Sequence, residues 1–198
     1  MPVTSGTPDM IRGAALGPFI DWYARVHGRA GLERALARLS EQDRRRFDPA
    51  APGLGISLAR WYASATIHRM LDGLLDGLDA HGRSALASAG ADETLASSLT
   101  GYLGVAFRSL VSPRMCAMLG PTLWHTYYSG GRVRIDPQGR RCHIMEVSGW
   151  SGHHAFLCEL NNAAGRAIYR AAGGDHVTTE HAACVARGDP TCVYVIRW

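Results

Sequence analysis

The pattern of apolar residues changes at the double glycine Gly130-Gly131, and this change constrains the fold more than any other feature of the sequence. Before it, apolar residues recur every three or four positions, which is the period of an amphipathic helix. After it, the segment Arg132-Val133-Arg134-Ile135 alternates polar and apolar residues, as a half-buried strand does. The sequence therefore predicts a helical part over residues 10–130 and a sheet-containing part over residues 131–198.

Glycine and proline residues divide the helical part into separate helices. Ser40 precedes a short polar segment and is expected to cap it, because a serine hydroxyl can accept a hydrogen bond from a free N–H of the first helical turn. The expected helices span about residues 10–27, 31–39, 43–47, 57–78, 83–110 and 114–128.

The sheet-containing part is predicted to follow a β-β-α-β-β order. Strands are expected at 132–136 and 142–147, with Pro137-Gln138-Gly139 as the turn between them. A helix is expected at 153–172, and two final strands at about 175–187 and 191–198 flank the turn Gly188-Asp189-Pro190. The predicted fold class is α+β, with N-terminal helices followed by an antiparallel sheet.

Length and composition narrow the class of protein. The chain of 198 residues is 46% hydrophobic and 19% charged, so one domain over residues 10–198, behind a flexible tail of residues 1–9, is expected. Residues 1–8 have no basic start followed by an apolar run, and no apolar stretch approaches about 18 residues. We therefore expect no membrane span and a cytoplasmic location. The net charge of +4 comes mostly from scattered arginines, which disfavours nucleic-acid binding.

Four residues of the sheet-containing part could form a metal site: Cys158, His181, Cys184 and Cys192. Thiolates and imidazoles are preferred ligands of a tetrahedral zinc ion. Cys184 and Cys192 flank the last predicted turn, so both thiols are expected at the mouth of one hairpin. Strand alternation would put His181 and Cys184 on opposite faces unless a bulge intervenes. The other interpretation is that these are ordinary buried cysteines, and spacing alone favours it.

Two segments resemble known families. Residues 180–198, EHAACVARGDPTCVYVIRW, place a Cys, a Gly-Asp turn and a second Cys before an aromatic-containing last strand, and this ending resembles that of 4-vinyl-reductase domains. The segments Ile11–Ala14 and Gly31–Leu39, with Asp43-Arg44, resemble a family of uncharacterised myxobacterial proteins. Together the two resemblances cover nearly the whole chain.

The first resemblance implies a structural zinc ion. The family's three cysteine ligands fall on Cys158, Cys184 and Cys192, and His181 stands near the position of the family's carboxylate ligand. Glu180 is a rival fourth ligand. Four protein ligands leave no open position for a catalytic water, so the implied role of zinc is structural.

The same resemblance implies a cavity between sheet and helices for a small hydrophobic or aromatic ligand. Aromatic side chains combine apolar surface with a polar group, which suits the lining of such a cavity. The candidate lining residues are Trp124, His125, Tyr127, Tyr128, Trp150 and Phe156. His153 and His154 are expected at the surface or at the cap of the following helix, because adjacent residues at a helix start point in different directions.

Haem is considered and disfavoured. The 4-vinyl-reductase fold is similar to that of haem-based nitric-oxide sensor domains, which carry a Tyr-x-Ser-x-Arg signature for the haem propionates. Here the segment Tyr127-Tyr128-Ser129-Gly130-Gly131-Arg132 brings the arginine one residue late. Such a shift displaces the guanidinium from bidentate contact with a carboxylate. His125, which follows a tryptophan, is the histidine considered as a haem ligand.

These observations favour a sensor or regulatory domain that binds a small molecule and acts through a signalling partner, as a homodimer. No catalytic residue is assigned, because the chain shows neither a Gly-rich dinucleotide fingerprint nor a nucleophile elbow. Three alternatives stay open. They are an enzyme or biosynthetic accessory for a tetrapyrrole-like molecule, a haem-based gas sensor, and a structural adaptor.

Overall fold

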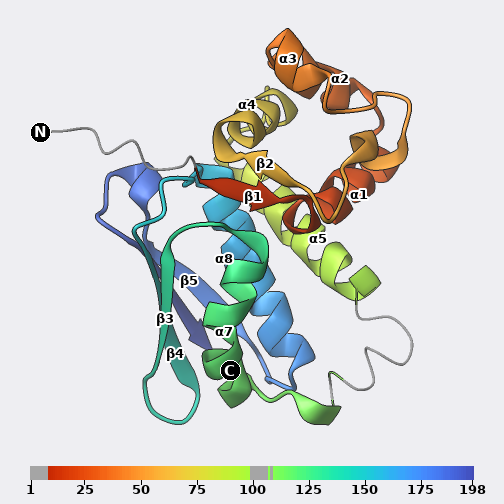
Figure 1. Ribbon diagram of the computed structural model, residues 1–198. Coiled ribbons are helices and arrows are strands. Elements are labelled where there is room, and N and C mark those ends of the chain that lie inside the picture. The colour runs from red at the N-terminus through yellow and green to blue at the C-terminus, as the bar shows by residue number, and fades with distance from the viewer. Residues whose placement is uncertain (1–8, 99–106, 108) are drawn as a thin grey trace, which may run out of the picture.

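The computed structural model describes residues 9–98, 107 and 109–198. The predicted N-terminal tail thus lies outside the described residues, apart from Asp9. Figure 1 shows a group of short helices above a four-stranded sheet, with the long helices α5 (Ala80–Ser98) and α8 (Ala155–Ala171) joining the two parts. The described residues form an α+β fold, as the sequence predicts.

The described part of the chain has a strand at residues 10–12, where a helix is predicted. Strand β1 (Met10–Arg12) pairs antiparallel with β2 (Trp61–Ala63), and both are short. The predicted helix 10–27 is therefore reduced to a 3-10 turn (Gly13–Ala15) and α1 (Gly17–His27), which has Pro18 in its first turn. A proline there is favourable because its missing N–H would have no partner in the helix.

The next helices agree better with those predicted from the spacing of apolar residues. Helix α2 (Ala30–Ala37) is followed by the single turn α3 (Glu41–Arg44). The Ser40 hydroxyl caps α3 by accepting a hydrogen bond from the Asp43 N–H at 3.1 Å.

The predicted helix 57–78 divides into β2 and α4 (Ser64–Leu74). The predicted helix 83–110 corresponds to α5 up to residue 98, and most of its remainder lies outside the described residues. Helix α7 (Pro113–Tyr127) precedes the sheet.

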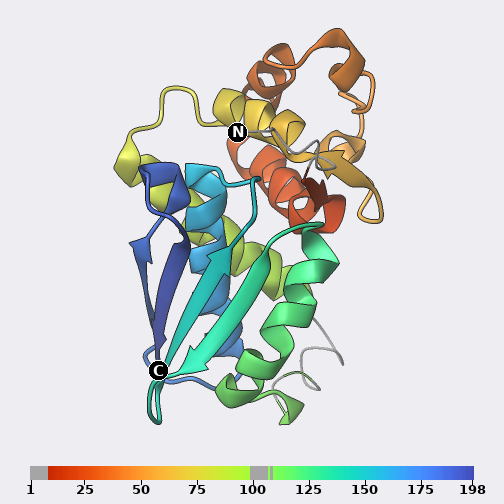
Figure 2. The same ribbon diagram turned by 60° about the vertical axis from the view of Figure 1, so that its left-hand side comes forward.

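The sheet contains β3 (Arg132–Pro137), β4 (Cys142–Ser148), β5 (Thr178–Ala183) and β6 (Cys192–Arg197) in the antiparallel order β3-β4-β6-β5. The β5–β6 register shifts between His181 and Ala183, and a 3-10 turn (Val185–Arg187) follows. The predicted strand 175–187 is therefore shorter than expected. Figure 2 shows α7 along the β3 side of the sheet, and α8 packs between the sheet and α5.

Apolar side chains from both parts form one large buried cluster, which includes Phe19 of α1, Leu71 of α4, Phe156 of α8 and Tyr194 of β6. A smaller cluster around Tyr169 and Ile196 lies at the other end of α8. None of the helices in the described part of the chain has the length and apolar character needed to cross a lipid bilayer.

The close packing of α4 on α2 depends on Gly73. A Cβ atom at this position would lie 2.7 Å from the Ala35 Cα and 2.7 Å from the Arg34 carbonyl oxygen, both of which are backbone atoms. We expect Gly73→Ala to lower the free energy of unfolding by about 1–3 kcal/mol, measured by urea denaturation. Gly165→Ala in α8 is the control, because its nearest neighbour is 3.7 Å away, and it should be neutral or stabilising by up to about 1 kcal/mol. Equal losses would contradict this account.

Candidate functional site

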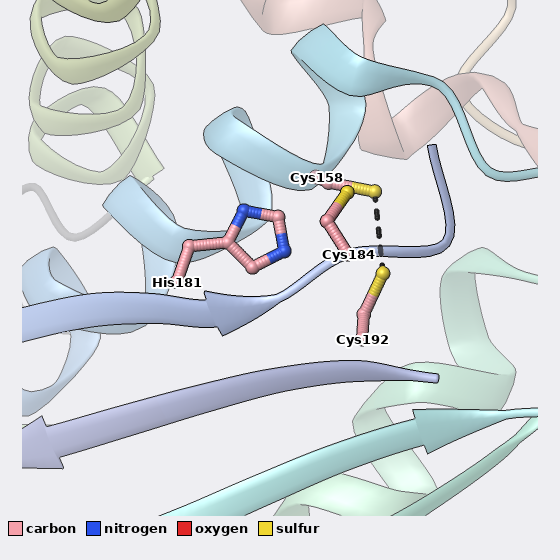
Figure 3. Close-up of side chains that lie close together, drawn as sticks. All are labelled: Cys158, His181, Cys184 and Cys192. Carbon is pink, nitrogen blue, oxygen red and sulfur yellow. Dashed lines mark hydrogen bonds between the residues drawn. The ribbon is translucent and has the colours of Figure 1, made fainter. Parts of the chain in front are cut away.

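The four predicted metal ligands lie together at one end of the sheet. Cys158 comes from the first turns of α8, His181 from β5, Cys184 from the segment after β5, and Cys192 from the first residue of β6. Each residue offers one ligand atom, and these four atoms all lie within 4.8 Å of one another. Figure 3 shows the four side chains close together. We call these four residues the thiol cluster.

An irregularity in β5 makes this convergence possible. His181 and Cys184 are three residues apart, so regular alternation would separate their side chains. The register shift between His181 and Ala183 adds the residue that brings both side chains to the same side. Cys184 is then held by the following turn, because its N–H donates a 2.7 Å hydrogen bond to a carboxylate oxygen of Asp189.

Cys192 is the acceptor at the centre of the thiol cluster. Its sulfur lies 3.6 Å from the Cys158 sulfur and accepts a hydrogen bond from the Val185 N–H at 3.4 Å. The Cys158 thiol, followed by the His153 imidazole, lowers the pKa of Cys192 to about 2, against the effect of burial. The same hydrogen bond raises the pKa of Cys158. The hydrogen bond between the two sulfurs therefore favours the charged form of Cys192 over that of Cys158.

The thiol cluster is cut off from solvent. Cys158, Cys184 and Cys192 are 1%, 2% and 0% exposed. The Nε2 atom of His181 is also buried and has no hydrogen-bond partner among the described residues. A buried thiolate is costly unless a cation or several donors compensate its charge. The donor types and their spacing suit a thiophilic metal ion.

A fifth donor was missed by the sequence reasoning. His154 caps α8 as expected, by accepting a hydrogen bond from the Phe156 N–H at 3.3 Å, but His153 faces the thiols. Its Nδ1 lies 3.2 Å from the Cys192 sulfur and 3.6 Å from the Cys158 sulfur. The signal was available. With His154 as the N-cap of α8, His153 is the residue before the cap and Cys158 is the fourth residue of the helix. Side chains at these two positions commonly pack together.

Glu180, the rival ligand, is placed elsewhere. Its side chain is exposed and lies 3.5 Å from Arg197. It is not a member of the thiol cluster.

The six predicted ligand-lining residues divide into separate groups. Trp124, Tyr128 and Trp150 are buried against one another, with ring centroids 4.1–5.1 Å apart, and we call them the aromatic wall. Phe156 instead packs on Phe19 at 5.5 Å. Tyr127 is half-buried, and His125 is exposed on α7.

A small polar pocket of about 260 Å³ adjoins the aromatic wall. It is lined by Gly131, Arg132, Ser148 and Gly149, and a Cβ atom on Gly131 would lie 2.7 Å from the Trp150 side chain. The Tyr-Ser-Arg residues considered for haem do not meet here. Neither Tyr127 nor Ser129 lines the pocket, and the Ser129 hydroxyl instead accepts a hydrogen bond from the Met10 N–H, so Arg132 alone of the three reaches the pocket.

Comparison with solved structures identifies the class of fold. The chain is similar to an Fe(II) unliganded H-NOX (haem-nitric oxide/oxygen binding) protein from K. algicida, with a TM-score of 0.66, 10% identity and coverage of 94% of this chain and 96% of that one. For an S. oneidensis H-NOX protein in the Fe(II)NO state, the TM-score is 0.64 and the sequence identity 12%, and the match covers 94% of this chain and 98% of that one. For a mutant of T. tengcongensis H-NOX, the TM-score is 0.63 and the sequence identity 10%, and the match covers 94% of this chain and 97% of that one. The chain has the H-NOX fold. No protein-family model and no curated protein matches the sequence.

This finding corrects two expectations. The assignment to the 4-vinyl-reductase class, with its myxobacterial relatives, is wrong, because the similar solved structures are H-NOX proteins. The expectation of zinc as the cofactor, with haem disfavoured, is also wrong, because these neighbours are haem proteins. The zinc expectation came from the short Cys–turn–Cys ending, and unrelated sequences can satisfy the same turn geometry.

The turn after Cys184 offers a test of how the thiol cluster is positioned. Asp189→Ala removes the acceptor for the Cys184 N–H, which should lower the free energy of unfolding by about 1–2 kcal/mol in urea denaturation. It should also speed the reaction of Cys184 with an aromatic disulfide reagent. Asp189→Asn keeps an acceptor oxygen and should retain most of the stability. Equal losses in the two variants would show that this hydrogen bond does not position Cys184.

Proposed function

We propose that this protein is a haem-based gas-sensor domain of the H-NOX type. The observation that carries the proposal is the likeness of fold, which extends over 94% of the chain and nearly the full length of each H-NOX structure compared. Haem iron would supply the coordination position at which a gas such as nitric oxide binds. The chain's own residues would bind the porphyrin and select its orientation.

Two features of the described residues fit a haem. The aromatic wall offers flat, buried apolar surface of the kind that lines cofactor sites. The polar pocket beside it is lined by Arg132 and Ser148, which would bind the propionate carboxylates. Because the rings of the wall already pack on one another, the porphyrin would lie beside the wall rather than within it.

His125 is the residue that we assign as the iron ligand. It follows Trp124 of the aromatic wall on α7, and its imidazole is exposed and has no hydrogen-bond partner among the described residues. Several other histidines are engaged. His143 bonds to Tyr169, His68 to Gly152, and His153 faces the thiols. Histidine is the proximal ligand in many haem proteins.

Haem binding can be tested by adding ferrous haem to the purified protein and recording the Soret absorption. We expect a saturable band distinct from that of free haem, which shifts when nitric oxide is added. His125→Ala should weaken binding by about tenfold or more, because a coordinate bond contributes more than the roughly 1.4 kcal/mol that a tenfold change represents.

His81→Ala is the matched control, since His81 is exposed on the first turn of α5. Absence of a saturable Soret band in the wild-type protein would reject the sensor proposal. A band that is unchanged in His125→Ala would reject only the assigned ligand.

A second activity is supported by a separate observation. We infer that the thiol cluster binds a metal ion, because three thiol groups and an imidazole lie within 4.8 Å of one another in a site closed to solvent. A buried, tetrahedral set of protein ligands leaves no position for a reacting water. The ion would thus stabilise the end of the sheet.

Elemental analysis across the first-row transition metals tests this site. We expect about one ion per chain, and we expect chelation to lower the unfolding midpoint, because ligand binding to the folded state adds to its stability. Cys192→Ser should lose the ion, whereas Cys142→Ser, on half-buried Cys142 of β4, should keep it. Metal-free protein whose unfolding midpoint is insensitive to chelator would identify the cluster as ordinary buried cysteines.

Three finer features complete the proposed function. We propose that the domain forms a homodimer, passes its signal to a partner protein and works in the cytoplasm. The H-NOX fold, which extends over nearly the whole chain, is compatible with each of these.

A further inference from the structure

Two histidines meet where the helical part of the chain contacts the start of α8. His68 is on α4 and His154 is the N-cap of α8, and their ring centroids lie 5.2 Å apart with an interplanar angle of 37°. Both are half-buried, and neither belongs to the thiol cluster. The pair therefore joins α4 to the loop of residues 149–154, two segments that are far apart in sequence.

The partners of the two rings fix where their hydrogens lie. The Gly152 carbonyl can only accept, so the His68 Nε2 at 3.0 Å carries a hydrogen and donates it. The His154 Nδ1 accepts from the Phe156 N–H at 3.3 Å, so this nitrogen carries no hydrogen. The His154 Nε2 donates to an Asp72 carboxylate oxygen at 3.1 Å. His154 is therefore neutral in this arrangement.

Acid acts against the arrangement at His154. A proton can be added only at Nδ1, where it removes the acceptor for the Phe156 N–H. It also places a cation at the start of α8, which is the positive end of the helix dipole. The Asp72 carboxylate opposes these two effects, but its side chain is 58% exposed, so solvent screens the attraction. The cap thus depends on a neutral His154.

The environment of His68 also disfavours a second charge. Burial lowers the pKa of His68, and the neighbouring His154 and Arg69 lower it as well, whereas the Gly152 carbonyl and Asp72 raise it. Asp72 and Arg69 on α4 and His154 on the loop are the charged or titratable groups that act on His68 among the described residues. Because this pKa lies below the ordinary value of 6.5, the contact is strongest above that pH and weakens as the pH falls below it.

We propose that His68 and His154 form a proton-sensitive latch, which holds the loop of residues 149–154 to α4 at neutral pH and releases it on acidification. In the closed latch both rings are neutral. In acid each ring takes up one proton from solvent, so two cations would face each other at a ring separation of 5.2 Å, and α8 would lose its cap.

Release of the loop would reach the aromatic wall, because Trp150 is part of the loop. The Trp150 ring packs edge-on against Trp124 at 5.1 Å and against Tyr128 at 4.8 Å. Tryptophan emission should therefore report the opening of the latch. Haem beside the wall would be bound less tightly in acid, a consequence that rests on the haem proposal, whereas the latch itself does not.

The test is amide hydrogen exchange of the full-length protein without added haem, followed by mass spectrometry at pH 7.5 and pH 5.5 and corrected for the intrinsic exchange rates. For each proton that the released loop takes up near pH 6.5, protection of residues 151–157 should fall by about tenfold between these pH values. Tryptophan emission should change over the same range, and Trp150→Phe should remove that change.

The variants separate the latch from other acid effects. His68→Gln keeps a donor for the Gly152 carbonyl, and His154→Asn keeps a good N-cap, but neither new side chain titrates in this range. The double variant should keep its protection at pH 5.5. His154→Asn alone should remove about a tenfold part of the loss, which provides the test if the double variant is unstable. His81→Gln, at an exposed histidine of α5, should match the wild type.

Two results would overturn the latch. One is an acid loss of protection that persists unchanged in the variants, because it would have to come from another group, such as the thiol cluster. The other is full protection of the wild-type loop at pH 5.5. Neither result involves haem. Absence of a Soret band would reject the sensor proposal and leave the latch standing, and an unlatched loop would leave the sensor proposal standing.

Discussion

The packing of α8 between the sheet and α5 is the contact on which both proposed sites depend. The helix presents Phe156, Leu157 and Leu160 to the main core, so its rotation about its own axis is determined by apolar burial. That rotation directs Cys158 toward β6 and Asn161 toward the Tyr128 hydroxyl. On its outer side, Arg166 and Arg170 form ion pairs with Asp92 of α5, and their partial exposure makes this a minor contribution.

The start of α8 is the second constraint, because several contacts meet in the loop of residues 149–154. His154 caps the helix and lies 3.1 Å from Asp72 of α4. The Ser151 backbone and hydroxyl both donate to Asp9, which ties the segment before β1 to this loop. A loop held from so many sides has little conformational entropy left to lose. The loop can therefore hold the aromatic wall and the thiol cluster in fixed positions relative to each other.

The two proposed activities are compatible in this architecture. The aromatic wall and its polar pocket lie where α7 and β3 meet the loop before α8, and the thiol cluster lies at the ends of β5 and β6. The cluster is closed and buried, as expected of a stabilising centre. The pocket reaches the surface through Arg132, as expected where charged groups of a ligand must stay in water. The thiol cluster would stabilise the sheet, while the aromatic wall and its pocket would bind the ligand.

Local sequence patterns determined much of the secondary structure of this protein. The glycine pair at 130–131, strand alternation and helical periodicity were enough for the β-β-α-β-β order and the Ser40 cap, because each depends on near neighbours in the chain. The cysteines and His181 were named as candidates from the sequence, but the β5 irregularity that brings His181 and Cys184 together is a tertiary feature. The β1–β2 pair, the H-NOX arrangement and the position of His153 were decided only by the tertiary structure. These features join segments far apart in sequence. Their stability comes from contacts that no short window of residues contains.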